Sequence, residues 1–160
     1  MKIIFKILIF ISIITNTCKA QAYVSVSPSI SATTGTMRDK LGAAVEIGQQ
    51  WGKLGIGFDI GKTCFSKIGT KDTTTYYEWR PFYTVYQSGS LSHVITLGYG
   101  KIFQAVQDNM FEINYGLEMN LSKKIDYITF FVGSYYLWGS GVSGSSPFAG
   151  ITLTKSLKRK

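Results

Sequence analysis

The sequence predicts an all-β fold: an eight-stranded antiparallel up-and-down transmembrane barrel preceded by a cleavable signal peptide. Three observations predict it. A short apolar segment occupies the N-terminus, apolar and polar residues alternate along most of the remaining chain, and short turns alternate with longer polar loops. Alternation with a period of two is typical of strands, whereas helices repeat every 3.6 residues. With 160 residues, the chain has the length of one domain.

The first element, residues 1–20, has the layout of a secretory signal peptide. A basic start is followed by an apolar run and then by small residues. The run is too short to span a membrane as a helix. We expect cleavage after Ala20, or as late as Ala22, which leaves residues 21–160 as the barrel. An alternative interpretation makes Cys18 the acylated residue of a lipoprotein.

The strands follow from the alternation, which is most regular in FEINYGLEMNLS, residues 111–122. The same pattern predicts strands at roughly 22–32, 41–51, 53–64, 74–87, 90–103, 110–121, 125–138 and 146–157. Short turns are expected at Gly52-Lys53, Ser88-Gly89 and Lys123-Lys124. Longer polar loops are expected at TTGTMRDK, SKIGTKDTT, QAVQDN and GSGVSGSS. Short turns on one side and longer loops on the other are typical of membrane barrels.

The apolar face is predicted to point outward, toward lipid. Gly and Ser crowd the polar positions, which suits a narrow interior, and no lysine lies in the middle of a predicted strand. A soluble barrel carries charged residues along its outer face. Aromatic residues gather near strand ends, as in interfacial girdles. The predicted girdle residues are Trp51, Tyr77, Trp79, Tyr86, Tyr136 and Trp138.

The polar face gives the candidate interior site. A two-residue turn at Gly52-Lys53 puts Glu46 directly opposite Asp59, and the Ser88-Gly89 turn requires one extra residue, a bulge. The inward set is Glu46, Asp59, Glu78, Arg80, Glu112 and Glu118. Opposed carboxylates repel each other, so Arg80 or water screens them, or one of the pair holds a proton. We interpret the set as a buried polar network, with a proton or cation path as the alternative.

Charge and cysteine content argue against other classes of protein. Removal of residues 1–20 leaves 14 basic and nine acidic residues, a net charge of +5 that is concentrated in the final KSLKRK. Nucleic-acid binding favours basic residues spread over a groove or face, so no nucleic-acid partner is expected. Cys64 is the one cysteine of the mature chain, so no intramolecular disulfide is available. No His/Cys cluster suggests a metal, and no cofactor is expected.

His93, the single histidine, is the one candidate for catalysis. It is predicted to face lipid, with Ser90 and Ser92 close in sequence. Ser92 and His93 are adjacent in a strand, however, so their side chains point to opposite faces. Because a nucleophile, a base and an orienting acid are not brought together, we assign no catalytic residues.

The chain resembles the small eight-stranded outer-membrane barrels of Gram-negative bacteria, of the OmpX and OmpA-domain type, in the architecture of its whole mature part. It departs from them at its end, FAGITLTKSLKRK, where such barrels usually finish on an aromatic residue. The resemblance implies an outer-membrane protein with a structural or interaction role, in contact with lipid and lipopolysaccharide, and with unknown partners for its surface loops. Two alternatives are a soluble periplasmic lipocalin-like barrel that binds an apolar ligand and an outer-leaflet lipid-modifying enzyme using His93.

Overall fold

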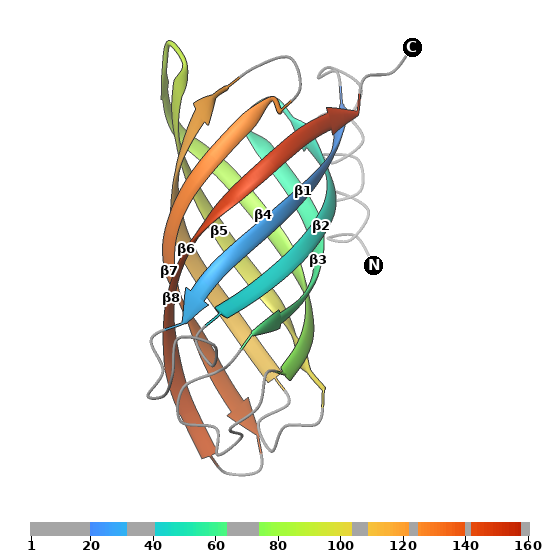
Figure 1. The fold of residues 1–160 in the computed structure, drawn as a ribbon, viewed down its shortest axis with the longest axis vertical. Helices are drawn as coiled ribbons and strands as arrows, with labels where there is room; N and C mark the ends of the chain where they lie inside the picture. Colours follow the sequence, from blue (N-terminus) through green and yellow to red (C-terminus); the bar gives the residue numbers. More distant parts are fainter. Residues whose placement is uncertain are drawn as a thin grey trace, which may run out of the picture.

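The computed structural model describes residues 20–31, 41–63, 74–103, 109–121, 125–139 and 142–157, and these form eight antiparallel strands. The strands are β1 (Gln21–Ser31), β2 (Leu41–Trp51), β3 (Leu54–Thr63), β4 (Thr74–Ser88), β5 (Leu91–Ile102), β6 (Asn109–Asn120), β7 (Tyr127–Gly139) and β8 (Val142–Leu157). They close into a barrel in sequence order (Figure 1). The predicted eight-stranded barrel is confirmed. Residues 1–19, most of the predicted signal peptide, lie outside the described part.

Closure depends on the pairing of the first and last strands. β1 pairs with β2 on one side and with β8 on the other, where Ala22 lies opposite Leu157 and Ser31 opposite Phe148. Each described strand therefore has two neighbours, and the sheet has no open edge. In the described ranges, no helix is long and apolar enough to cross a membrane.

The barrel has two different ends. At the end drawn uppermost in Figure 1, β1 begins, β8 ends, and two-residue turns join β2 to β3 and β4 to β5; we call it the turn end. The opposite end, where β1 ends and β2 begins, is the loop end. Gly52 and Gly89 in the two turns have φ values of 60° and 58°. Glycine adopts this left-handed conformation without the steric cost of a Cβ, which fixes both turn positions.

The β4–β5 turn corrects one prediction. Ser88 pairs with Leu91, so the turn is Gly89-Ser90 rather than Ser88-Gly89. The predicted bulge is present between Thr84 and Tyr86. The bulge adds one residue to β4, so the turn lies one position later than predicted. On the loop-end side of the bulge the pairing is the predicted one, with Glu78 opposite Gly100.

The start of β8 corrects another prediction. The strand begins at Val142, which pairs with Gly139, so most of GSGVSGSS belongs to a hairpin rather than to a long loop. Gly and Ser carry no alternating apolar signal, and pairing with β7 orders this segment instead. The predicted register of β6 and β7 is confirmed, with Glu118 opposite Thr129. The Lys123-Lys124 turn, TTGTMRDK and QAVQDN lie largely outside the described residues, as does most of SKIGTKDTT.

The two faces of the sheet differ in chemistry. The outer face carries exposed large apolar side chains around the barrel, among them Val45 on β2, Ile60 on β3, Leu97 on β5, Ile113 on β6 and Val132 on β7. The inner face carries buried Ser, Thr, Glu, Asp and Asn side chains together with glycines. The distribution is the reverse of a soluble globular domain, in which the apolar side chains are inside.

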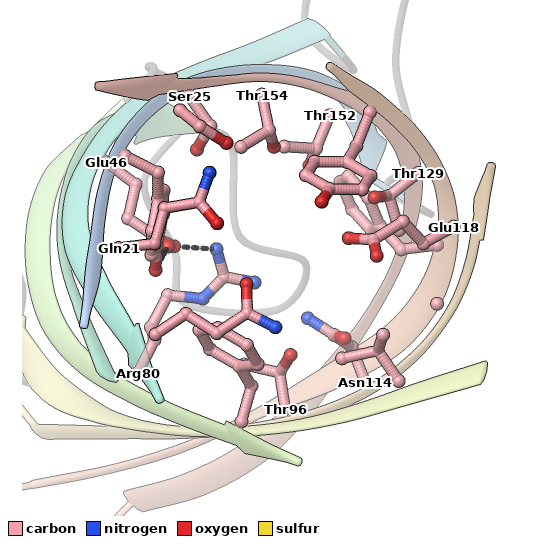
Figure 2. A pocket seen from close by; sticks show the side chains of 18 residues that line it. Gln21, Ser25, Glu46, Arg80, Thr96, Asn114, Glu118, Thr129, Thr152 and Thr154 are labelled. Atoms are coloured by element: carbon pink, nitrogen blue, oxygen red, sulfur yellow. Dashed lines mark hydrogen bonds and ion pairs between the residues drawn. The ribbon is translucent and has the colours of Figure 1, made fainter. Parts of the chain in front are cut away.

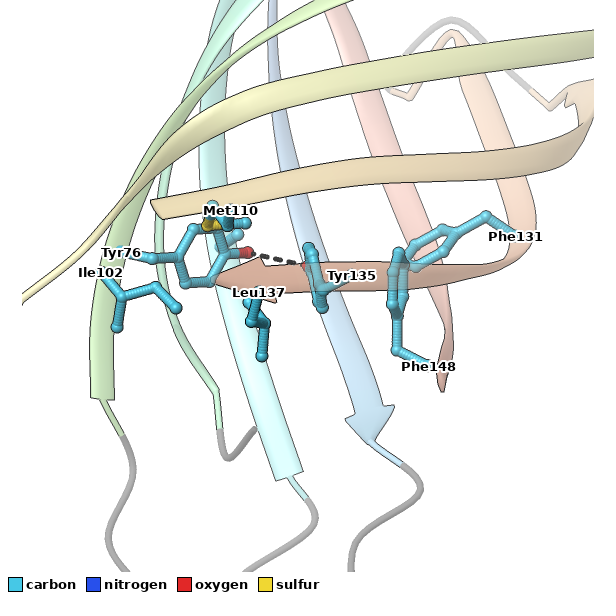
Figure 3. Packing of buried hydrophobic residues seen from close by; sticks show 8 residues of the cluster. Tyr76, Ile102, Met110, Phe131, Tyr135, Leu137 and Phe148 are labelled. Atoms are coloured by element: carbon cyan, nitrogen blue, oxygen red, sulfur yellow. Dashed lines mark hydrogen bonds between the residues drawn. The ribbon is translucent and has the colours of Figure 1, made fainter. Parts of the chain in front are cut away.

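One part of the interior is apolar, which the sequence analysis did not predict. Toward the loop end, buried side chains pack together in what we call the apolar layer (Figure 3), formed by Ala44, Tyr76, Ile102, Met110, Phe131, Tyr135, Leu137 and Phe148. Tyr135 stacks on Phe148 with ring centroids 4.2 Å apart, and Met110 and Leu137 have no exposed surface. The interior is therefore polar through its middle, and toward the loop end it holds this apolar cluster beside buried Ser31, Thr63 and Ser146.

Candidate functional site

The guanidinium of Arg80 organises the middle of the barrel. Arg80 lies on the inward-facing side of β4, and its Nη1 is 2.6 Å from Glu46 Oε2 on β2. Its Nη2 is 2.9 Å from Glu112 Oε1 on β6. Asp59 Oδ2 lies 3.8 Å from Nη1, and Glu78 Oε1 lies 3.6 Å from Nε. These five residues, the Arg80 cluster, come from four strands.

The strand register explains why so many carboxylates meet. Glu46 pairs with Asp59 across β2 and β3, and Asp59 pairs with Glu78 across β3 and β4. Like charges at paired positions repel each other. Arg80 supplies the opposing charge, and it is the one cation among the described inward-facing side chains.

Neutral side chains complete part of the cluster. Tyr23 donates a hydrogen bond to Glu46, and Asn114 donates one to Glu112. The Tyr76 hydroxyl donates to Asp59 Oδ2 at 3.4 Å, which joins the cluster to the apolar layer. These hydrogen bonds stabilise carboxylates whose negative charge one guanidinium does not fully compensate.

Glu78 is the least satisfied member of the Arg80 cluster. Its side chain has no exposed surface, and neither carboxylate oxygen has a hydrogen-bond partner within the described residues. Gly98 gives it space, since a Cβ there would lie 2.1 Å from Glu78 Oε2. Among the described residues, Arg80 is the counter-charge nearest to this buried carboxylate, at 3.6 Å, which is a costly arrangement.

Glu118 lies apart from the other predicted inward acids. It lines a cavity of about 80 Å³ between the turn end and Arg80 (Figure 2). Gln21 and Gln50 line the same cavity near the turn end, and Glu46 and Arg80 line its deep side. A cavity of this size accommodates several water molecules. The middle of the barrel can therefore be hydrated from the turn end.

The predicted girdle residues lie on the outer face, in two groups. Toward the loop end, Trp79 contacts Phe58 at 5.0 Å between ring centroids, and Tyr136 stacks on Trp138 at 5.9 Å. Tyr77 belongs to the same group. Toward the turn end are Trp51, which pairs with Leu54, and Tyr86, which pairs with His93.

Charged side chains on the outer face are confined to the two ends of the described strands. Lys62 and Lys101 lie toward the loop end. At the turn end, Lys155 Nζ is 3.0 Å from Asp126 Oδ1. Between these two levels, the described outward positions carry no Asp, Glu, Lys or Arg.

His93 lies on the outer face, as its register requires, while Ser92 is buried inside. The imidazole Nδ1 is hydrogen-bonded to the Tyr115 hydroxyl, and its ring contacts Tyr86 at 5.6 Å between centroids. These neighbours are phenols rather than a nucleophile and an acid. In the described parts of the chain, no group of three or more His, Cys, Asp or Glu side chains is arranged to hold a metal ion.

The barrel is similar to solved structures, although the chain matches no protein-family model and no curated protein. The N-terminal β-barrel domain of Pseudomonas aeruginosa OprF gives a TM-score of 0.55 at 11% identity, over 86% of this chain and 100% of that domain. The outer membrane protein Ail of Yersinia pestis in a phospholipid bilayer nanodisc gives 0.48 at 14% identity, over 86% and 100%. The OprF similarity confirms the predicted resemblance at the level of the fold.

Proposed function

We propose that the protein is a small outer-membrane β-barrel with a structural or interaction role in the bacterial envelope and without a wide pore. The observation that carries this proposal is the apolar outer face of a closed sheet. Soluble monomers rarely expose contiguous apolar patches larger than a few hundred Å². In hydrocarbon, a closed barrel satisfies every backbone hydrogen bond and leaves its apolar side chains in a matching solvent.

The height of the uncharged zone supports this location. On β3, the outward positions between Lys53 in the turn and Lys62 near the loop end are Leu54, Ile56, Phe58 and Ile60. At about 3.3 Å per residue and a strand tilt of about 40°, this stretch covers roughly 23 Å along the barrel axis. Outer-membrane barrels carry an apolar band about 25 Å tall between aromatic girdles.

The two ends suggest the orientation and the lipid partner. Membrane barrels place short turns on the periplasmic side, so the turn end faces the periplasm and the loop end faces outward. Lys62 and Lys101 then lie at the level of the outer headgroups, beside Tyr77. Ammonium groups at that level attract the phosphates of lipopolysaccharide, while their aliphatic stems cover the apolar wall.

The soluble lipocalin-like alternative requires the opposite faces. Phe58, Leu117 and Phe130 would line a ligand cavity in such a barrel, but they lie on the outer face, and Phe130 is 45% exposed. The interior holds the Arg80 cluster and the apolar layer instead. This placement contradicts a lipocalin-type cavity.

The experiment is fractionation of cells that express the full chain, followed by electrophoresis of unheated and boiled samples. We expect recovery with the outer membrane and a mobility shift on boiling, because a closed barrel resists detergent at room temperature. Recovery as a soluble periplasmic protein, or a membrane protein with no shift, would contradict the proposal.

A further inference from the structure

We propose that the cavity between the turn end and Arg80 is a binding site for the primary ammonium group of a small linear amine, with the Glu118 carboxylate as its counter-charge. Binding itself depends only on the closed barrel. The orientation proposed above adds that the site opens toward the periplasm.

Glu118 is an acid without a described counter-charge. It faces inward near the end of β6, and its paired neighbours are Ser92 on β5 and Thr129 on β7, neither of which is charged. None of the ion pairs or hydrogen bonds within the described residues involves its carboxylate. Arg80 lines the same cavity, but its guanidinium is held by Glu46 at 2.6 Å. Among the described residues that line the cavity, Glu118 is therefore the carboxylate left for an external cation.

Buried hydroxyls without partners point to the same ligand. Ser25 on β1 is 2% exposed and Thr96 on β5 is 8% exposed, and both line the cavity. Neither side chain has a hydrogen-bond partner within the described residues, although buried polar side chains in native proteins nearly always have one. Figure 2 shows both side chains around the same space as Glu118. A bound group that donates hydrogen bonds would satisfy them.

The strand register joins these groups into one stretch of wall. Glu118 pairs with Thr129, and Thr129 pairs with Thr152 on β8. Thr154, which follows on the same face of β8, pairs with Ser25. The inner wall from β6 to β1 therefore carries a carboxylate followed by hydroxyls, all of which line the cavity.

This wall matches a primary ammonium better than other ligands. An ammonium group has three N–H donors and no acceptor, and carboxylate and hydroxyl oxygens accept hydrogen bonds. An anion would be repelled by Glu46 and Glu118. A divalent metal ion requires several strong ligands, and in the described ranges no group of three or more His, Cys, Asp or Glu side chains is placed to hold one.

The size of the cavity limits the ligand to a slender one. Its volume of about 80 Å³ exceeds that of a single water site but is far below the roughly 300–1,000 Å³ of sites for drug-sized molecules. Gln21 and Gln50 lie toward its mouth, and Phe82 and Tyr127 also line it. Aromatic rings attract cations and pack against alkyl chains. The site therefore suits an ammonium group on a short unbranched alkyl chain.

The test is a titration of the folded full chain in uncharged detergent micelles with butylammonium chloride, followed by amide NMR. We expect saturable shifts of the signals of Gly116 and Thr129, which line the cavity, and no shift for Gly61 toward the loop end. 1-Butanol has the same carbon chain without the charge, and it should not saturate these signals. Butyltrimethylammonium keeps the charge without N–H donors, and it should bind more weakly than butylammonium.

Three variants assign the binding to the cavity. Glu118→Gln should raise the Kd for butylammonium about tenfold or more, which is the loss expected for a charge-assisted hydrogen bond. Ser25→Ala removes one neutral acceptor and should raise the Kd about two- to tenfold. Asp126→Asn is the matched control: it removes one negative charge at the turn end, from a residue that does not line the cavity, and it should leave the Kd unchanged. Each variant is first checked for a mobility shift on boiling.

The ammonium site is overturned if butylammonium gives no saturable shift, if 1-butanol or butyltrimethylammonium binds as tightly, or if the largest shifts lie at the loop end. A Kd that Glu118→Gln leaves unchanged, or that Asp126→Asn raises equally, also contradicts it. The ligand series uses wild type, so its result does not depend on the folding of a variant. Failure of the membrane location appears separately, in the fractionation experiment.

Discussion

Arg80 on β4 holds Glu46 on β2 across the intervening strand, with 2.6 Å between Arg80 Nη1 and Glu46 Oε2. The same guanidinium reaches Glu112 on β6 at 2.9 Å. One cation therefore ties three alternate strands together inside the barrel, and the expected effects of several substitutions follow from that arrangement.

Replacing Arg80 with Met should destabilise the barrel by about 3–5 kcal/mol, because it leaves buried carboxylates without a counter-charge. Arg80→Lys should cost less, since it keeps the charge but loses the fork that reaches two strands. Urea unfolding in detergent micelles measures both. An Arg80→Met protein within about 0.5 kcal/mol of wild type would show that the cluster does not support the fold.

Glu78 and Glu46 should respond differently to the same change. Glu78→Gln removes a charge that has no described hydrogen bond, so it should be neutral or stabilising by up to about 2 kcal/mol. Glu46→Gln replaces the ion pair to Arg80 with a neutral hydrogen bond and weakens the bond that Tyr23 donates, and it should cost about 1–3 kcal/mol. The comparison uses the same urea titration. A larger loss of unfolding free energy for Glu78→Gln than for Glu46→Gln would show that Glu78, rather than Glu46, is the carboxylate that stabilises the barrel.

Gly100 should not tolerate a side chain. An added Cβ would lie 1.9 Å from the Tyr77 carbonyl oxygen and 2.6 Å from Glu78 Cβ, and backbone cannot move aside cheaply. Gly100→Ala should therefore cost about 1–3 kcal/mol or prevent assembly. Gly144→Ala is the control, since a Cβ there meets nothing within 4 Å. Equal boiling-shift temperatures for the two variants would contradict the predicted packing.

Asp126, which precedes β7 at the turn end, should titrate below its ordinary value. The backbone N–H of Ser156 donates to its carboxylate at 2.8 Å and Lys155 donates at 3.0 Å, and these bonds lower the pKa of Asp126 from 3.8. The associated stabilisation is present above pH 3.8 and is lost as the pH falls through the lower native value. Carbon-detected NMR of the carboxyl group measures the titration, with Asp126→Asn to assign the signal. A native pKa at or above 3.8 would contradict the contact.

The registers were predictable because alternation and turn length fix them together. Gly52-Lys53 joins two strands whose apolar residues must share a face, and that requirement alone places Glu46 opposite Asp59. The requirement that apolar residues share one face also predicted the bulge in the β4–β5 hairpin. The exact position of the turn was not predictable, because the extra residue of the bulge can belong to the strand before Gly89 or to the strand after it.

The apolar layer was not predictable from alternation. Met110 and Leu137 alternate in step with Glu112 and Tyr135 and therefore face inward. In the sequence, an apolar residue at a polar position near a strand end is interpreted as the end of the alternating pattern. The one sequence feature that could have indicated the layer was that the predicted register pairs Met110 with Leu137. The ion pair of Asp126 with Lys155 joins a turn to β8, a contact that no periodicity specifies.

The most direct test of the central claim, that the apolar face contacts lipid, is spin-label accessibility on β5. Nitroxides are placed singly at Leu97, which is 41% exposed, and at Thr96, which is 8% exposed, in a background without native cysteines. In reconstituted vesicles, the Leu97 label should be readily relaxed by oxygen and poorly relaxed by a water-soluble nickel complex. The Thr96 label should be less accessible to oxygen. A Leu97 label open to the nickel complex, or shielded from both reagents, would contradict a lipid-facing wall.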